Sequence, residues 1–248
     1  MKVKNIYLAS FVTILLAVFT TAHAQNIISI KADKPYAQIQ PTMWGVFFED
    51  INLGADGGIY AELVKNRSFE FSKPLMGWEL KQNFFNEGAV TVINRPGQNL
   101  ANPRFTRIKL NDAQPGTLSL TNEGFRGMGI KKGIRYDFSL MYRLPQGNVK
   151  IHAEIMNGSK QVLASGELTA AVAGNGWKKQ AFSMVTTDSC LKGKLKVWFE
   201  GTGDIDIDMV SLFPEDTWKK RPAGMRADMI QLLADMKPGF LRFPGGCI

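Results

Sequence analysis

Between Met76 and Phe213 the sequence breaks into short β-prone runs separated by turn residues. The runs are Ala89–Ile93, Phe105–Leu110, Thr117–Leu120, Arg135–Arg143, Val149–Met156, Gln161–Leu168, Lys179–Val185, Lys194–Glu200 and Ile205–Phe213. Clusters of Gly, Pro and Asn lie between them, and Asn157-Gly158 predicts a tight turn. Many short strands with this punctuation are typical of an antiparallel β-sandwich or jelly roll. We therefore predict such a domain over residues 76–213.

A different pattern precedes this region. In Trp44–Asn52, the apolar residues Val46, Phe47 and Phe48 are followed directly by Glu49 and Asp50. An apolar run of this kind, between turn residues, predicts a strand buried on both faces. Carboxylates at its end lie where parallel-sheet enzymes keep their chemistry. The run is equally compatible with a core strand that simply ends at solvent.

The pattern changes again after Pro214. The apolar residues Met225, Met229, Leu232, Leu233 and Met236 have helical spacing and predict an amphipathic helix. A second candidate for a buried strand follows at 240–243. Strand, helix and strand are the βαβ pattern of a parallel sheet, so the sandwich is predicted to interrupt an α/β domain.

The predicted organisation is therefore multidomain α/β plus β. A barrel start over residues 25–75 is followed by the inserted sandwich over 76–213 and by a continuation over 214–248. Within the first part, residues 27–39 predict one or two short strands, and Ile59–Val64 predict a short helix.

Residues 1–24 have the pattern of a secretory signal peptide. Lys2 and Lys4 precede the apolar run Ile6–Val18, and Ala22-His23-Ala24 resembles a cleavage site. No later run approaches membrane-spanning length. We predict an exported protein, periplasmic or extracellular, that has no membrane association after signal cleavage.

Charge and cysteine usage argue against several classes of protein. The formal net charge is +8, but after the signal peptide the basic residues occur singly or in pairs, whereas nucleic-acid binders carry denser basic stripes. Cys190, Cys247 and His152 have no metal-ligand spacing. The two cysteines could pair in an exported protein, but nothing in the sequence brings their segments together. We expect no metal, no cofactor and no nucleic-acid partner.

An acidic cluster near residue 206 imitates a calcium loop. Asp204, Asp206, Asp208 and Glu215 match charged positions of an EF-hand, but Met209 stands where that loop needs glycine. The alternation with Ile205 and Ile207 predicts a half-buried strand instead.

Four segments together point to a known family: Gly45–Asn52, Gly57–Glu70, Asp208–Pro214 and Pro238–Cys247. The first reads Gly-Val-Phe-Phe-Glu-Asp-Ile-Asn, and the last reads Pro-Gly-Phe-Leu-Arg-Phe-Pro-Gly-Gly-Cys. They resemble the α-L-arabinofuranosidases of glycoside hydrolase family 51, in the branch with an inserted carbohydrate-binding-module-like sandwich. The resemblance covers essentially all of the chain after the signal peptide.

This resemblance implies a (β/α)8 barrel followed by a terminal β-sandwich, and possible oligomers of the full-length protein. It implies retaining hydrolysis of terminal α-L-arabinofuranosyl residues from plant cell-wall arabinoxylan or arabinan, by one glutamate acting as acid and one as nucleophile.

Both glutamates are expected on later barrel strands. Outside the insert, about 85 residues remain here against the roughly 250 that such a barrel needs. The resemblance therefore predicts an incomplete barrel with no catalytic residue in this chain, and no activity of this chain alone. Glu62, Glu70 and Glu87 show no pairing that would replace the missing glutamates, and we expect them to be surface charges.

The same resemblance assigns roles to individual residues. Glu49 matches a glutamate that binds sugar hydroxyls, and Arg242 matches an arginine that orients the nucleophile and lowers its pKa. Cys247 lies where many relatives carry a sugar-binding asparagine, and a thiol is a weaker partner. Asp50 is expected to be framework, and Gly245-Gly246 to let the backbone approach the sugar.

A non-catalytic function is the alternative. The protein would then be a secreted carbohydrate-binding protein that acts through the sandwich. Aromatic side chains for stacking on sugar rings would come from Trp78, Trp177, Phe84, Phe85 and Tyr142, although aromatic residues in a sandwich belong more often to its core.

Overall fold

The computed structural model describes residues 27–83, 85–95, 101–172, 174 and 176–243, so the predicted signal peptide lies outside the described residues. The chain divides into two compact units, 1–43 and 44–248. In the first, the described residues are exposed and contain the short 3-10 helix η1 (Pro41–Met43). The strands predicted over 27–39 are wrong. No strand of that unit pairs with them in the described part of the chain, and strands need partners for their backbone groups.

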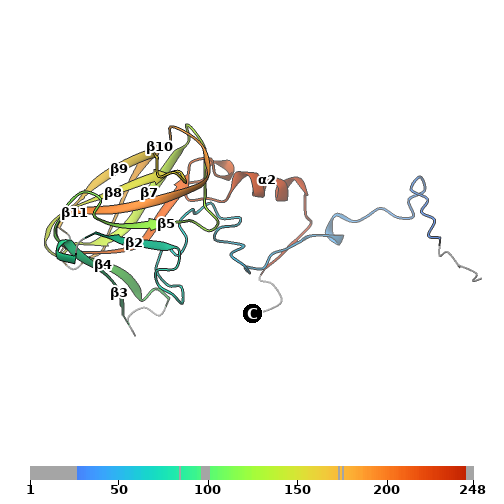
Figure 1. Cartoon of the computed structure of the whole chain (residues 1–248). Helices are drawn as coiled ribbons and strands as arrows, with labels where there is room; N and C mark the ends of the chain where they lie inside the picture. Colours follow the sequence, from blue (N-terminus) through green and yellow to red (C-terminus); the bar gives the residue numbers. More distant parts are fainter. Residues whose placement is uncertain (1–26, 84, 96–100, 173, 175, 244–248) are drawn as a thin grey trace, which may run out of the picture. The chain divides into compact units, whose positions relative to one another are not determined.

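In the second unit, ten strands form one antiparallel sheet (Figure 1). They are β2 (Trp78–Gln82), β3 (Gly88–Asn94), β4 (Arg104–Ala113), β5 (Leu118–Asn122), β6 (Met128–Ile130), β7 (Arg135–Arg143), β8 (Gly147–Met156), β9 (Val162–Ala170), β10 (Lys178–Val185) and β11 (Cys190–Pro214). The short 3-10 helix η2 (Phe85–Glu87) precedes β3, and η3 (Trp218–Lys220) follows β11.

The sheet consists of two layers that share β11. The first layer has the order β9-β8-β11-β5-β2, and the second has the order β10-β7-β11-β4-β3. The first half of β11 pairs with β8 and β5, and its second half pairs with β7 and β4. One strand of 25 residues therefore joins both layers.

Glycines let β11 pass from one layer to the other. Gly201 and Gly203 have φ values of 105° and 135°, which side chains disfavour, and the register with β4 shifts between Gly201 and Thr202. A Cβ on Gly201 would lie 2.1 Å from the carbonyl oxygen of Asn148. Only glycine permits this close approach of β11 to β8.

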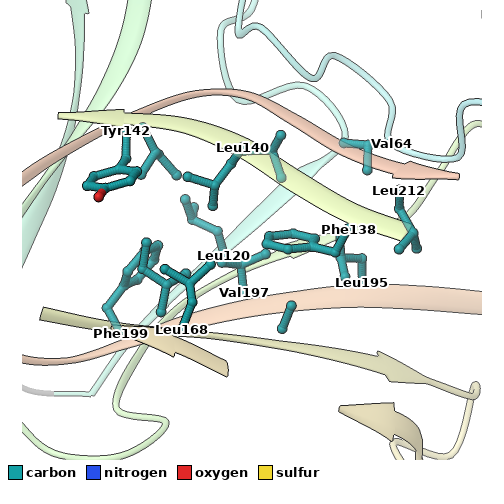
Figure 2. Packing of buried hydrophobic residues seen from close by; sticks show 14 of the residues in the cluster. Val64, Leu120, Phe138, Leu140, Tyr142, Leu168, Leu195, Val197, Phe199 and Leu212 are labelled. Atoms are coloured by element: carbon teal, nitrogen blue, oxygen red, sulfur yellow. The ribbon is translucent and has the colours of Figure 1, made fainter. Parts of the chain in front are cut away.

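The hydrophobic core lies between the layers. Figure 2 shows Phe138, Leu140 and Tyr142 directed toward Leu120 and Val197 of the facing layer. All five side chains are buried. Alternate residues of these strands face this core, which is the pattern that half-buried strands produce.

The nine β-prone runs all overlap observed strands, so the prediction of a largely β region is confirmed. Two details differ. The runs Lys194–Glu200 and Ile205–Phe213 belong to the single strand β11, because the glycines between them bend the strand without ending it. The Asn157-Gly158 turn is present, and the Asn157 side-chain oxygen accepts hydrogen bonds from the amides of Ser159 and Gln161.

The helix predicted over Ile59–Val64 is wrong. Its backbone amides bond to distant segments: Ala61 donates to the carbonyl of Gly224 at 3.2 Å, and Leu63 donates to Leu212 at 3.1 Å. Tertiary hydrogen bonds therefore override the weak helix preference of this segment. Val64 and Phe69 are buried in the same core as the ten-stranded sheet.

The remaining elements form a small α/β arrangement. The strand β1 (Val46–Phe47) pairs in parallel with β12 (Leu241–Arg242), and the helix α2 (Ala227–Asp235) precedes β12. The predicted strand-helix-strand order is confirmed, and the parallel pair joins segments that the whole sheet separates in sequence.

Burial in this part differs from the prediction. Phe47 is 52% exposed and Leu241 is 67% exposed, so these strands are not buried on both faces. In α2, Leu232 is 68% exposed and no residue is fully buried. The apolar stripes are present, but the described residues supply no second layer to cover them.

We predict that Phe69→Ala destabilises the chain by about 3–5 kcal/mol, the usual cost of truncating a buried phenylalanine. Phe69 is fully buried and its ring packs 5.6 Å from that of Trp78. Thermal or urea unfolding measures the change. Phe240→Ala is the matched control, because Phe240 is exposed. Equal stability of the two variants would contradict the placement of Phe69 in the core.

Candidate functional site

The adjacent carboxyl ends of β1 and β12 form the candidate site. The register pairs Val46 with Leu241 and Phe47 with Arg242. The amide of Val46 donates to the carbonyl of Phe240 at 2.9 Å, and the amide of Phe48 donates to that of Arg242 at 3.0 Å. Parallel pairing brings both strand ends to one edge of the sheet, which is where the chemistry of parallel-sheet enzymes lies.

Glu49 follows the last residue of this ladder and is half-buried. The chain then turns sharply, with left-handed backbone at Asn52 and Leu53. Asp50 holds this turn, because its carboxylate accepts a hydrogen bond of 2.9 Å from the amide of Ala55. A framework role for Asp50 fits this geometry.

Arg242 lies on β12 directly across from Phe47. Its guanidinium carbon is 5.5 Å from the centre of the Phe47 ring, a cation–π distance, and its side chain is exposed. On the neighbouring pair of positions, the rings of Phe48 and Phe243 stack at 5.7 Å. The structure thus brings the segments of Glu49 and Arg242 together. Cys247 and Gly245-Gly246 lie outside the described residues.

A cavity of about 670 Å3 opens beside the turn after Glu49. Several parts of the second unit line it: the turn and the segment that follows it to Leu63, the chain around β6 and the start of β7, both ends of β11 with Asp216, and the start of α2. Its polar lining includes Glu62, Tyr136, Asp216, Arg226 and Asp228. The cavity is large enough for a small ligand.

Glu62 is buried, contrary to the expectation of a surface charge. Burial raises the pKa of Glu62, while hydrogen bonds from Leu212, Ser211 and Val64 and the nearby Arg67 act in the opposite direction. The Leu212 and Val64 amides donate to Oε1 at 2.9 and 3.0 Å. These bonds join the segment after β1 to β11, so Glu62 is a structural residue.

Two residues of the acidic cluster, Asp206 and Asp208, are also buried, whereas Asp204 is exposed. Asp206 accepts hydrogen bonds from Arg107 and Arg143 of the two neighbouring strands. Asp208 accepts from the side chain of Asn102 at 3.0 Å. The predicted strand is confirmed, but its burial differs from the prediction, because Asp206 and Asp208 are buried along with Ile205 and Ile207. Among the described residues, no group of three His, Cys, Asp or Glu could hold a metal ion.

The aromatic candidates do not form a common platform. Tyr142 is fully buried, and Trp78 is 7% exposed with its indole nitrogen bonded to the carbonyl of Asn66. Trp177 packs edge-on against Phe105. Phe84 and the side chain of Phe85 lie outside the described residues.

Sequence reasoning missed Trp198, although its pattern contains the signal. In Lys194–Glu200, Leu195, Val197 and Phe199 alternate with Lys196, Trp198 and Glu200. Alternation places the second set on the side opposite the core. The structure shows this arrangement, with Trp198 half-buried on the outer side of the first layer.

The chain is similar to named proteins over most of its length. An extracellular exo-α-L-arabinofuranosidase of Streptomyces chartreusis is 36% identical over 92% of this chain, which is 27% of the relative's length. An Arabidopsis thaliana α-L-arabinofuranosidase 2 is 28% identical over 98% of this chain and 38% of its own length. No family model matches the sequence.

One solved structure supports the same relationship. An arabinose-bound α-L-arabinofuranosidase named MgGH51 superposes with a TM-score of 0.73 and 30% identity, over 86% of this chain and 36% of that one. The chain thus spans about a third of the length of these relatives. None of the described helices is long and apolar enough to cross a membrane.

We predict that Asp208 makes stability depend on pH. Burial raises its pKa to about 6 from the ordinary 3.8, so its ionised form destabilises the folded state above pH 6. That cost is about 3 kcal/mol at neutral pH and disappears as the pH falls from 6 toward 4. Acidification should therefore raise the unfolding free energy of wild type relative to that of Asp208→Asn.

Chemical unfolding of both proteins between pH 4 and 8 measures this shift. Asp204→Asn, an exposed position of the same strand, is the matched control for the loss of one charge. A constant difference between Asp208→Asn and wild type over this range would contradict the prediction.

Proposed function

Because the chain is homologous to the α-L-arabinofuranosidases of glycoside hydrolase family 51, we propose that it is the N-terminal part of such an enzyme. The activity would be the retaining removal of terminal α-L-arabinofuranosyl residues from arabinoxylan or arabinan. The proposal includes export, which the extracellular relative and the pattern of residues 1–24 support.

One observation carries this proposal beyond sequence similarity. β1 and β12 pair in parallel although about 190 residues separate them in sequence, and these residues form the ten-stranded sheet and then α2. This order supports the proposal of a (β/α)8 barrel that begins here, because in such a barrel each strand is followed by a helix and the next parallel strand. The exposed faces of Phe47, Leu241 and Leu232 are then the surfaces that later strands and helices cover.

In this proposal the ten-stranded sheet is a jelly roll inserted into the barrel. The domain limits 25–75, 76–213 and 214–248 stay predictions. Val64 and Phe69 are buried in the core of the ten-stranded sheet, which favours assigning the segment after Glu62 to the inserted domain.

The residues at the strand ends bind and orient, and the bond-breaking glutamates are expected on later strands. Glu49, at the end of β1, would accept hydrogen bonds from sugar hydroxyls. Arg242, at the end of β12, would pair with the nucleophilic carboxylate and keep it ionised. Cys247 would line the same pocket and bind the sugar less strongly than an asparagine.

A chimeric enzyme tests these roles. Residues 25–248 replace the matching third of the Streptomyces chartreusis relative, and activity is measured on an aryl α-L-arabinofuranoside. We expect turnover by the chimera and none by residues 25–248 alone. Turnover by the isolated chain would contradict the assignment of catalysis to later strands.

In this chimera, we predict that Glu49→Gln lowers kcat/KM by about 10- to 1,000-fold, the range for loss of a charged hydrogen-bond partner in the transition state. Glu215→Gln, at an exposed glutamate outside the proposed binding surfaces, is the matched control. Wild-type kinetics of Glu49→Gln would contradict the sugar-binding role.

Arg242→Gln should shift the pH profile of the chimera. Loss of a positive charge raises the pKa of a neighbouring carboxylate, so the acidic limb of kcat/KM should move to higher pH. An unchanged acidic limb with a lower maximum would indicate a structural role for Arg242.

A second candidate function is carbohydrate binding by the inserted sheet. The outer side of the first layer favours it, because Trp198 is surrounded there by hydrogen-bonding side chains.

A further inference from the structure

The outer side of the first layer carries polar side chains in rows across five strands. One row, read from the cross-strand register, is Glu167, His152, Trp198, Ser119 and Lys81. The next row is Ser165, Glu154, Lys196, Thr121 and Glu79. We call these ten residues, together with Lys150 and Glu200, the Trp198 face.

Trp198 is held upright in the middle of this face. Its ring stacks on His152 with centres 3.6 Å apart and planes 2° from parallel. Its indole nitrogen donates to Glu154 at 2.9 Å. Glu154 also lies 3.4 Å from the Lys196 ammonium. The indole is therefore oriented by its neighbours before any ligand arrives.

The indole has different neighbours on the two adjacent strands. His152 covers the ring on the β8 side, whereas the cross-strand partner on β5 is the small residue Ser119. The Ser119 hydroxyl is buried and makes no hydrogen bond to the described residues. The Lys196 ammonium lies over the ring, 5.8 Å from its centre. An indole that is packed on one side and has polar neighbours around the rest of its ring can stack on a sugar ring while these neighbours bond to the hydroxyls.

The charges of the Trp198 face neutralise one another. Lys150 pairs with Glu200 at 3.2 Å, and His152 lies 3.2 Å from Glu167. Burial alone would raise the pKa of the Glu200 carboxyl group. Lys150 and His152 outweigh burial and hold this pKa below its ordinary value. The Glu200 carboxylate is therefore a hydrogen-bond acceptor at neutral pH. Paired charges of both signs attract neither a polyanion nor a polycation. They offer many donors and acceptors to an uncharged polar ligand.

A shallow hollow continues the face beside Lys196. Its volume is about 120 Å3, and its polar lining includes Glu79, Thr121, Glu123 and Lys194. Glu79 and Thr121 belong to the same row as Lys196. The Trp198 ring and the hollow therefore lie one after the other across the strands, an arrangement that suits an extended ligand.

The outer side of the second layer is occupied by the protein itself. Phe105 is 2% exposed there, beneath Arg95, Arg107, Arg143 and Trp177. On that layer the half-buried Trp177 packs against Phe105 and lies beside the guanidinium groups of Arg95 and Arg143.

We propose that the Trp198 face binds a neutral polysaccharide chain, with Trp198 stacked on a sugar ring and the flanking carboxylates and lysines bonded to hydroxyls. The choice of a polysaccharide rests on the proposed function, because it is the material that such an enzyme acts on. The face would hold the polymer at a place separate from Glu49 and Arg242.

Titration of the full chain with soluble arabinoxylan tests the proposal, because binding needs no turnover. We expect Trp198→Ala to weaken binding by about tenfold or more, and Trp198→Phe to retain most of it, in line with the worth of one aromatic stacking contact. Trp218→Ala is the matched control, since Trp218 is half-buried and lies outside the sheet. Circular dichroism and melting of each variant establish that the fold is intact.

Three results would overturn the proposal. They are no binding by the wild type at millimolar sugar, equal binding by Trp198→Ala and wild type, or loss of binding in Glu49→Gln while Trp198→Ala still binds. Tighter, salt-sensitive binding of polygalacturonate would assign the face to a polyanion instead and would also overturn it. An inactive chimera with Trp198-dependent binding would refute the proposed catalysis and leave this proposal standing.

Discussion

The structure depends on one strand serving two layers. β11 supplies backbone hydrogen bonds to β8 and β5 in its first half and to β7 and β4 in its second half. Its inward side chains, among them Val197, Phe199 and Leu212, reach the core from both layers. The bend at Gly201 and Gly203 makes this possible, because a side chain at either position would meet the backbone of the neighbouring segment.

The same strand connects the sheet to the candidate site. Glu62 lies fifteen residues beyond the end of β1, and its buried carboxylate accepts a hydrogen bond from the amide of Leu212 on β11. A buried carboxylate is costly unless its oxygens are satisfied, so this bond fixes the position of the segment strongly. The turn after Glu49 is therefore anchored at one end by the ladder with β12 and at the other by β11.

Local patterns in the sequence were enough to find most strands, α2, and the strand-helix-strand order. Alternation and turn residues are local, and they do not depend on distant partners. The errors occurred where distant partners decide the outcome. Ile59–Val64 lost its predicted helix to hydrogen bonds with Gly224 and Leu212. Burial of Asp206 could not be read from its neighbours, because Arg107 and Arg143 come from other strands.

For the site, the sequence identified the segments that meet, and the parallel pairing of β1 with β12 places Glu49 and Arg242 on adjoining strands. The roles of these residues came from family resemblance and stay predictions. Trp198 was overlooked because aromatic residues in a β-rich region were considered by type, whereas their side of the strand decides their use. Trp78 and Tyr142 face the interior, while Trp198 shares its side with Lys196 and Glu200. Strand parity separates core aromatics from those that can meet a ligand, because side chains on the same side of a strand share the same surroundings.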